Sequence, residues 1–323
     1  MSARLVTVTL NPALDVSTSV EAMVPSHKLR ADDPAIEPGG GGINVSRMAA
    51  RLGAEADTVV VLGGSTGTRL EQLAEAEGLH LRVVPAEGET RQSIAVFDRS
   101  TEQLYRVVLP GAPLTPPVIE RCAAAVAAAV APHGEVASRP AVEGASAVVV
   151  SGSLPTGSPE NSLPAMIAAA GDAPVIVDTS GEALRDALDA GVSLIKPSAR
   201  ELGRLAGREL DTEADVLDAA LEVMAASPTE ALAVSIGAGG AFLVRHDQPP
   251  VRFRAPAVKV ASTVGAGDSM VAAIAVALAA GDDVVEAMRR GVATGTAAVL
   301  TAGSALADPA QIDRLYDLVV VEG

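Results

Sequence analysis

The sequence contains almost no aromatic side chains. Phe, Tyr and Trp together make up 2% of the 323 residues, and Trp is absent. Proteins that bind single-stranded nucleic acids use aromatic platforms for base stacking, and the formal net charge of −16 repels a phosphate backbone. We therefore expect no nucleic-acid partner. A small anionic substrate is compatible with this charge, because charges beyond a Debye length of about 8 Å are largely screened.

Cysteine and histidine are scarce as well. The single cysteine, Cys122, excludes a disulfide within the chain and a CxxC site. It lies in the alanine-rich stretch RCAAAVAAAV, which is typical of a buried helical position rather than of a reactive thiol. The four histidines are scattered and form no HExxH motif, so we do not expect a zinc site.

Long hydrophobic runs are also missing. No segment approaches the ~18 apolar residues of a membrane-spanning helix. The apolar run in the N-terminal stretch MSARLVTVTLNPALD is too short for a signal peptide. We expect a soluble, cytoplasmic protein with no membrane partner.

The hydrophobic residues, 49% of the chain, form short β-branched runs that alternate with helix-like segments. The runs are LVTVTL (5–10), TVVVL (58–62), AVVVS (147–151), PVIVD (174–178), SLIK (193–196) and LAVSI (232–236). This alternation indicates an α/β protein with a mostly parallel sheet and helices on both faces. Segments 14–37 and 91–110 contain strands without crossover helices and indicate a small antiparallel lid. Residues 131–145 have the composition of a surface loop.

Clusters of small and polar residues follow the predicted strands. They are NPALD, GGSTG, GSLPTG, TSGE, PSARE and GAGG, each directly after one of the six runs. Ordinary turn chemistry explains any one of them. In open α/β sheets, however, ligands bind outside the carboxyl ends of the strands. Six clusters at one edge therefore favour a ligand site there.

Four consecutive glycines, Gly39 to Gly42, stand in the stretch EPGGGGINVSRMAARLG (37–53). A glycine run is usually a flexible linker, but this one passes at once into apolar residues spaced for one face of a helix. Glycine costs conformational entropy on folding. The run therefore predicts a turn where a ligand approaches the main chain at a helix N-terminus.

A second glycine-rich turn, in STVGAGDSMVAAIAVALAAG (262–281), precedes an apolar helix predicted at 269–280. Free backbone amides at such an N-terminus can bind an anion. Asp268, at the mouth of the helix, is a candidate catalytic residue, although an N-cap is the alternative. No GxxxxGK[ST] or GxGxxG motif is complete, so a P-loop enzyme and a dinucleotide dehydrogenase are disfavoured.

These motifs, taken together, resemble the ribokinase-like (PfkB-type) sugar kinases, and within them the 6-phosphofructokinase and 1-phosphofructokinase branch. The resemblance covers nearly the whole chain and rests on LNPALD, EPGGGGINVSR, TRQ, YRVVLPG, VVSGSLPTG, VDTSGEAL, IKPSAREL, VSIGAGGAFLV and STVGAGDSM, in this order. It implies one three-layer ribokinase-like domain over 1–323, with a mostly parallel central sheet and a small β-sheet lid. It also implies an ATP-dependent phosphosugar kinase.

The resemblance assigns roles to particular residues. Asp268 would be the general base, and the amides of Gly265, Ala266 and Gly267 would stabilise the transferred phosphoryl group. The sugar phosphate would contact Asp15, Lys28, Gly39, Gly40, Gly41, Gly42, Asn44, Arg91, Arg106 and Ser151, with Lys28, Arg91 and Arg106 as the cations for its phosphate. These three could instead be ordinary surface cations of the lid.

ATP and Mg²⁺ are the implied cofactors. The nucleotide side would comprise Lys196, Ser198, Glu201, Ser235, Gly237, Ala238, Gly240, Thr263, Val292 and Thr296. A K⁺ site is implied at Ser262, Val264, Ala298, Thr301 and Gly303, although Thr301 stands where related enzymes can carry Asn. The usual Asn-x-x-Glu motif appears here as Ser198-Ala-Arg-Glu201. Serine is shorter than asparagine, which puts the positioning of Mg²⁺ in doubt.

The choice of substrate depends on the glycine run. The family's 1-phosphofructokinases commonly have a lysine where this chain has Gly41, which favours fructose 6-phosphate as the acceptor, phosphorylated at O1. The alternatives are a 1-phosphofructokinase, a tagatose-6-phosphate kinase and, from a different class, a non-catalytic nucleotide or sugar-phosphate sensor. By analogy with the fold, we expect a homodimer that forms through the lid.

Overall fold

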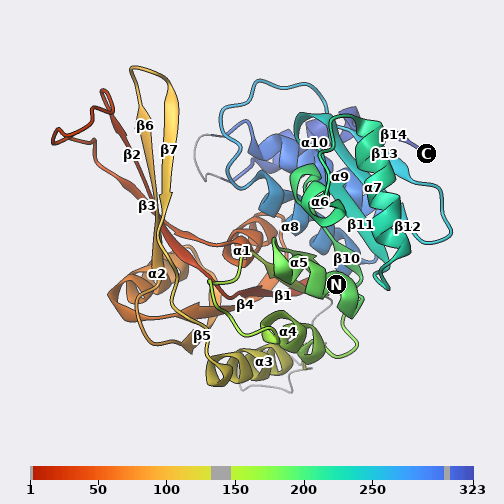
Figure 1. Cartoon of the computed structure of the whole chain (residues 1–323), viewed down its shortest axis with the longest axis horizontal. Helices are drawn as coiled ribbons and strands as arrows, with labels where there is room; N and C mark the ends of the chain where they lie inside the picture. The colour runs from red at the N-terminus through yellow and green to blue at the C-terminus, as the bar shows by residue number, and fades with distance from the viewer. Residues whose placement is uncertain (1–2, 132–146, 302–305) are drawn as a thin grey trace.

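A ten-stranded sheet forms the centre of the computed structural model, which describes residues 3–131, 147–301 and 306–323 (Figure 1). Its strand order is β14-β13-β12-β11-β10-β9-β8-β1-β4-β5. All pairings from β5 to β11 are parallel, and those from β11 to β14 are antiparallel. The strands are β1 (Arg4–Thr9), β4 (Glu55–Leu62), β5 (His80–Pro85), β8 (Ala147–Ser151), β9 (Val175–Asp178), β10 (Leu194–Ile195), β11 (Ala231–Ser235), β12 (Gly240–Arg245), β13 (Val251–Arg254) and β14 (Val320–Glu322).

Helices cover both faces of this sheet because alternate residues of the central strands are apolar on both sides. In β8, for example, Val148 and Val150 belong to one buried cluster and Val149 to the other. One face packs against α3 (Pro116–Val130), α4 (Ser162–Ala169), α5 (Glu182–Ala190), α6 (Ala199–Ala206) and α7 (Glu213–Ala225). The other packs against α1 (Gly41–Arg51), α2 (Gly64–Ala76), α8 (Ala266–Ala280), α9 (Val284–Ala298) and α10 (Pro309–Leu318). The predicted α/β class with two helical layers is confirmed.

Cys122 lies in α3, inside the cluster on the first face. Burial raises the pKa of its thiol to about 12. The thiol is therefore protonated at neutral pH and acts as a small apolar side chain, as the alanine-rich context predicts.

The lid is a separate four-stranded sheet that projects from the body, on the left in Figure 1. Its order is β3-β2-β6-β7, with the strands β2 (Ala13–Val20), β3 (Ala35–Gly39), β6 (Arg91–Asp98) and β7 (Gln103–Val108). The small sheet is present where it was expected, but one of its pairings, β2 with β6, is parallel. The chain passes through β3, α1, β4, α2 and β5 between these two strands, so a hairpin cannot join them.

The carboxyl ends of β1, β4, β8, β9, β10 and β11 lie at one edge of the sheet, because these strands are parallel neighbours. The six polar clusters therefore meet at this edge, as predicted. Most of the predicted loop 131–145 lies outside the described residues. None of the described helices is long and apolar enough to cross a membrane.

Candidate active site

The glycine run lies where the N-terminus of α1 presses against the ends of β1 and β8. Gly40 precedes the helix with φ +123°, a conformation that L side chains rarely adopt. A Cβ added at Gly41 would stand 2.6 Å from the amide nitrogen of Gly152, and one at Gly42 would stand 2.6 Å from the carbonyl oxygen of Val8. A Cβ at Gly39 would collide with the carboxylate of Asp15. Packing of the protein itself thus requires these glycines, and their contact with a sugar remains a prediction.

Asp268 lies in the first turn of α8, behind a glycine turn in which Gly265 has φ +74°. The side-chain amide of Asn44, in the first turn of α1, donates a hydrogen bond to Asp268, with 2.8 Å between Nδ2 and Oδ2. Burial raises the pKa of the Asp268 carboxyl to about 7. The charge of Asp178 acts in the same direction, whereas the Asn44 hydrogen bond and Lys196 act against it. A carboxyl group with a pKa near neutrality is suited to accepting a proton.

A buried ion pair lies beside this turn. Lys196 follows β10 and its Nζ is 3.1 Å from Oδ1 of Asp178, the last residue of β9. A Cβ added at Gly267 would stand 3.6 Å from the Lys196 Nζ, so the cation lies next to the amides of the α8 N-terminus. Asp178 is a site residue that the sequence motifs did not predict. A carboxylate at the end of the buried run VIVD is the signal that could have identified it.

The base of the lid brings together a second set of predicted residues. Arg91 donates to the carbonyl oxygen of Asn11 at 2.9 Å, and Arg106 Nε donates to Ser93 Oγ at 3.0 Å. Burial raises the pKa of the Asp15 carboxyl, although the positive charge of Arg106 and a hydrogen bond from Ser93 oppose this effect. One carboxylate and two guanidinium groups thus share the inner end of the lid. Ser151, also predicted here, has a buried hydroxyl without a hydrogen-bond partner among the described residues.

Lys28 is not part of this set. It is exposed, in the connection 21–34 that leaves the outer end of β2 at Val20. Asp98 accepts from the Met23 amide at 3.0 Å, and the Asp32 amide donates to the Ser19 carbonyl oxygen at 3.0 Å, so both halves of the connection are tied to the outer end of the lid. The contact of Lys28 with the sugar phosphate remains a prediction.

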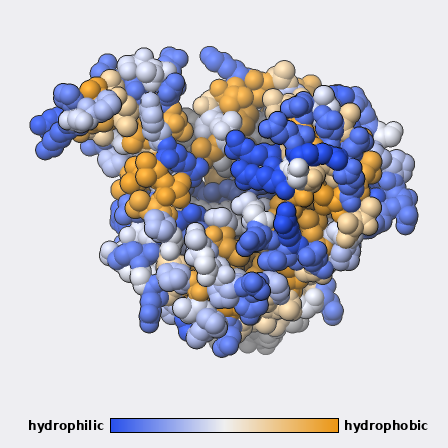
Figure 2. Space-filling model, in the orientation of Figure 1, coloured by the Kyte–Doolittle hydropathy of each residue, from blue (hydrophilic) through white to orange (hydrophobic). Residues whose placement is uncertain are grey.

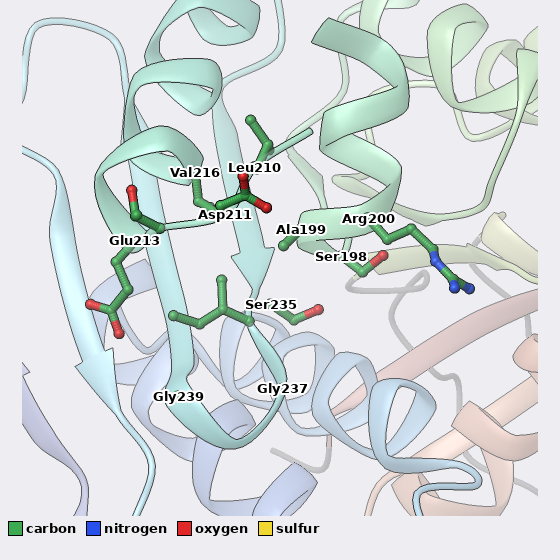
Figure 3. A pocket seen from close by; sticks show the side chains of 12 residues that line it. Ser198, Ala199, Arg200, Leu210, Asp211, Glu213, Val216, Ser235, Gly237 and Gly239 are labelled. Atoms are coloured by element: carbon green, nitrogen blue, oxygen red, sulfur yellow. The ribbon is translucent and has the colours of Figure 1, made fainter. Parts of the chain in front are cut away.

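Three of the predicted nucleotide-side residues, Ser198, Ser235 and Gly237, line a cleft of about 380 Å³ between the starts of α6 and α7 and the turn after β11. Ser198 and Ser235 pair through an isolated parallel bridge, and Figure 3 shows both beside the turn at Gly237, a residue in the short 3₁₀ helix Gly237–Gly239. Ala238 lies in the same helix. Gly240 begins β12, and a Cβ there would stand 2.8 Å from the Ala255 amide, so this glycine is needed for packing.

Ser198 and Glu201 form a capping box at the start of α6. The Ser198 amide and hydroxyl both donate to Glu201 Oε2 at 2.8 Å, and the Glu201 amide donates back to Ser198 Oγ at 3.3 Å. The shorter serine therefore has a defined local role here: it fixes the position of the Glu201 carboxylate.

Val292 and Thr296 lie in α9. This helix packs against the GAGD turn, since a Cβ added at Gly295 of α9 would stand 3.1 Å from the Ala266 carbonyl oxygen. Both side chains are buried, and the Thr296 hydroxyl donates to the Val292 carbonyl oxygen at 2.7 Å. Their predicted place near the adenine remains a prediction.

The residues predicted for a K⁺ site lie between the GAGD turn and the end of α9. The Val264 amide donates to Ser262 Oγ at 3.2 Å, and the Thr301 hydroxyl donates to the Ala298 carbonyl oxygen at 2.8 Å. The Ser262 amide donates to the Val299 carbonyl oxygen at 3.3 Å, which joins the two segments. Thr263 is exposed beside them, and Gly303 lies outside the described residues. Among the described residues, no cluster of His, Cys, Asp and Glu side chains could hold a metal ion by itself.

Figure 2 shows that the surface is hollowed between the lid and the body. Asp15, Arg91 and Arg106 belong to the lid, whereas Asp268 and Lys196 belong to the edge of the large sheet. A site with two guanidinium groups on the lid, and with a lysine and a carboxyl group of raised pKa at the edge of the large sheet, can bind phosphorylated ligands and remove a proton.

Residues 9–311 match the model of the pfkB family of carbohydrate kinases. This chain belongs to the pfkB family. It is 39% identical over 318 residues to the ATP-dependent 6-phosphofructokinase isozyme 2 of Mycobacterium tuberculosis, covering 98% of this chain and 89% of the relative. It is 33% identical over 324 residues to the 1-phosphofructokinase of Rhodobacter capsulatus, covering 100% of this chain and 98% of the relative.

Crystal structures of Escherichia coli phosphofructokinase-2 resemble this pfkB-family chain throughout its length. The complex with fructose-6-phosphate has a TM-score of 0.85 at 36% identity, and the complex with potassium has a TM-score of 0.88 at 38% identity. Each covers 98% of this chain and 99% of the other. The predicted family and ribokinase-like fold are thus confirmed, and the chain is a kinase of this family.

Proposed function

We propose that this kinase transfers the terminal phosphoryl group of ATP to O1 of fructose 6-phosphate, giving fructose 1,6-bisphosphate. The observation that carries the proposal is the placement of Asp268, whose pKa is raised to about 7, at the start of α8 and beside Lys196. Asp268 is the base that takes the proton of the acceptor hydroxyl. The amides of Gly265, Ala266 and Gly267, with Lys196, stabilise the negative charge on the transferred group.

The lid supplies the contacts with the sugar phosphate in this proposal. Asp15 accepts hydrogen bonds from sugar hydroxyls, and Arg91 and Arg106 bind the phosphate. Ser151 offers a buried hydroxyl that has no partner among the described residues. The absence of a lysine at Gly41 supports fructose 6-phosphate over fructose 1-phosphate, because the family's 1-phosphofructokinases commonly carry a lysine there. In this chain a side chain at Gly41 would collide with Ser151 and Gly152. A lysine in this place would need a different path of the chain after β8.

ATP and Mg²⁺ fit the residues present. The nucleotide lies along the cleft at Ser198, Ser235 and Gly237, with Lys196 toward its phosphates. Glu201 and Asp178 are the nearby carboxylates that would hold Mg²⁺. When bound, Mg²⁺ neutralises charge on the phosphates. A K⁺ ion at Ser262, Val264, Ala298 and Thr301 would lie close to the same anion site.

A homodimer through the lid is supported by exposed apolar side chains on the edge strand β7. Leu104, Val107 and Val108 have 54%, 56% and 50% of their surface exposed. An uncovered apolar edge strand is a site of self-association. E. coli phosphofructokinase-2, for comparison, has a tetrameric inhibited form.

A coupled ADP-release assay over a panel of phosphosugars tests the proposed function. We expect kcat/KM for fructose 6-phosphate to exceed that for fructose 1-phosphate by at least about tenfold, or roughly 1.4 kcal/mol of discrimination. Tagatose 6-phosphate is the second comparison. A preference for fructose 1-phosphate would favour a 1-phosphofructokinase, the activity of the R. capsulatus relative. No ADP release with any phosphosugar would contradict the assignment.

A further inference from the structure

Asn44 and Asp268 lie in the first turns of two different helices, and their side chains meet across the gap between them. Within the described residues, the amide of Asn44 supplies the only side-chain hydrogen bond to the Asp268 carboxylate, at 2.8 Å. Lys196, the nearby cation, is already paired with Asp178. Asn44 is therefore the neutral donor in direct contact with the Asp268 carboxyl group.

The helix that carries Asn44 is firmly anchored. Two residues further on, the Ser46 hydroxyl is hydrogen-bonded to the hydroxyls of Thr7 in β1, at 2.6 Å, and of Thr58 in β4, at 2.7 Å. Val45 and Met48 are fully buried in the same apolar cluster as Val271 and Ile274 of α8. The two helices are thus packed together, which limits how far the Asn44 amide can move away from Asp268.

The charged groups around Asp268 come from several elements. Asp178 at the end of β9 and Asp15 in β2 disfavour the ionised carboxylate, as does burial, whereas Lys196 after β10 favours it. Glu201 at the start of α6 contributes a further negative charge near Lys196 and Asp178. Negative neighbours and burial thus oppose ionisation, and the Asn44 hydrogen bond acts against them.

We propose that Asn44 is a positioning residue for Asp268: its amide fixes the orientation of the carboxylate and stabilises the ionised form that accepts the proton. This role differs from a contact with the sugar, because it operates before any sugar is bound. That the oriented carboxylate serves as the base of a kinase rests on the proposed function. The hydrogen bond and its effect on the ionisation of Asp268 are independent of the proposed function.

The test compares the titration of Asp268 in the wild type, in Asn44 variants and in Ser46→Ala, all without ligands, by ¹³C NMR of aspartate carboxyl groups. The Asp268 signal is assigned through Asp268→Asn. Asn44→Leu replaces the amide with an apolar group of similar shape. We expect the titration midpoint of Asp268 to rise by about one pH unit or more, the effect of losing a hydrogen bond to a charged group. Asn44→Ala removes the amide without filling its space and provides the same reading if Asn44→Leu does not fold.

Ser46→Ala is the matched control, since it removes a buried hydrogen bond from the same helix without touching Asp268. We expect it to lower thermal stability and leave the Asp268 midpoint unchanged. An unchanged midpoint in a folded Asn44 variant would overturn the proposal. So would an equal rise in Ser46→Ala, because the effect would then come from helix packing.

A kinetic measurement connects this role to turnover. In Asn44→Leu, the pH at which kcat/KM for fructose 6-phosphate falls on the acid side should rise together with the NMR midpoint. The smaller ionised fraction of Asp268 should by itself lower kcat/KM about fivefold at pH 7, and this loss should disappear near pH 9. A residue that only binds sugar would change KM without moving the limb. If the wild-type protein turns over no phosphosugar, the proposed function fails, while the NMR result still decides the role of Asn44.

Discussion

Lys196 and Asp178 form an ion pair in the interior, with 3.1 Å between Nζ and Oδ1 and only 5% and 17% of the two side chains exposed. Burial on its own would lower the pKa of Lys196, but the charge of Asp178 and its hydrogen bond raise it above the usual value. Lys196 therefore stays protonated although it is buried, and a permanent cation is available next to the α8 N-terminus.

Breaking this pair should be costly. In Asp178→Asn the Lys196 ammonium loses its counter-ion inside the protein, and removing one partner of a buried pair typically costs about 3–5 kcal/mol. We expect a loss of that size in the free energy of unfolding, measured by urea denaturation. Adding Lys196→Met should restore part of the stability while activity stays low. A double variant no more stable than Asp178→Asn would contradict the ion-pair account.

Arg91 and Arg106 should differ in their effects, although both are proposed to bind the sugar phosphate. Each substitution by alanine removes a charge-assisted hydrogen bond of about 1.5–3 kcal/mol, so KM for fructose 6-phosphate should rise far more than KM for ATP. Arg91→Ala should also lower the melting temperature more than Arg106→Ala, because Arg91 ties β6 to the carbonyl oxygen of Asn11 in the turn after β1, whereas Arg106 bonds to Ser93 of the neighbouring lid strand. Arg99→Ala, at the outer end of the lid, is the control and should leave both KM values unchanged. Equal changes in both KM values would point to a structural role for the arginines.

Ser198→Ala should have two separable effects. Loss of the N-cap of α6 should cost about 1 kcal/mol of stability, and release of the Glu201 carboxylate should raise the Mg²⁺ concentration needed for half-maximal activity. Asp308→Ala removes the N-cap of α10, where Asp308 accepts from the Ala310 amide, and should reproduce only the first effect. Both are measured by thermal denaturation and a Mg²⁺ titration. An unchanged Mg²⁺ requirement in Ser198→Ala would remove Ser198 from metal positioning.

Val107→Asp should weaken self-association through the lid. Val107 is 56% exposed and lies on the opposite face of β7 from Arg106, because neighbouring residues of a strand point to opposite sides. A charge there should shift sedimentation velocity toward the monomer. Leu318→Asp, also at an exposed leucine but at the end of α10, should not. An oligomer that survives Val107→Asp would place the interface elsewhere.

Much of the large sheet could be predicted because its central strands are apolar on both faces and read as continuous β-branched runs. Strands β5, β12, β13 and β14 were missed. HLRVVP, GAFLVR and VRFR each carry arginine, which breaks such a run, and β14 is only three residues long. The parallel pairing of β2 with β6 could not be read from either segment, because it depends on the route of the chain between them.

The same distinction applies to the site. Asp268 could be found from its local motif, whereas its hydrogen bond with Asn44 joins residues 224 positions apart and depends on how α1 packs against α8. Lys28 was grouped with Arg91 and Arg106 by motif, but the path of the connection 21–34 sets its position at the outer end of the lid. Local motifs identify residue types, and the packing of distant elements decides which of them meet.

The role of Asp268 is tested by comparing wild type and Asp268→Asn in steady-state ADP release with fructose 6-phosphate. The substitution keeps the size of the side chain and removes its ability to accept a proton. We expect kcat to fall by about 10²–10⁴-fold, the usual contribution of a general base, with KM for ATP and for fructose 6-phosphate nearly unchanged. A variant that keeps more than roughly a third of the wild-type kcat, far above that range, would show that Asp268 is not the base.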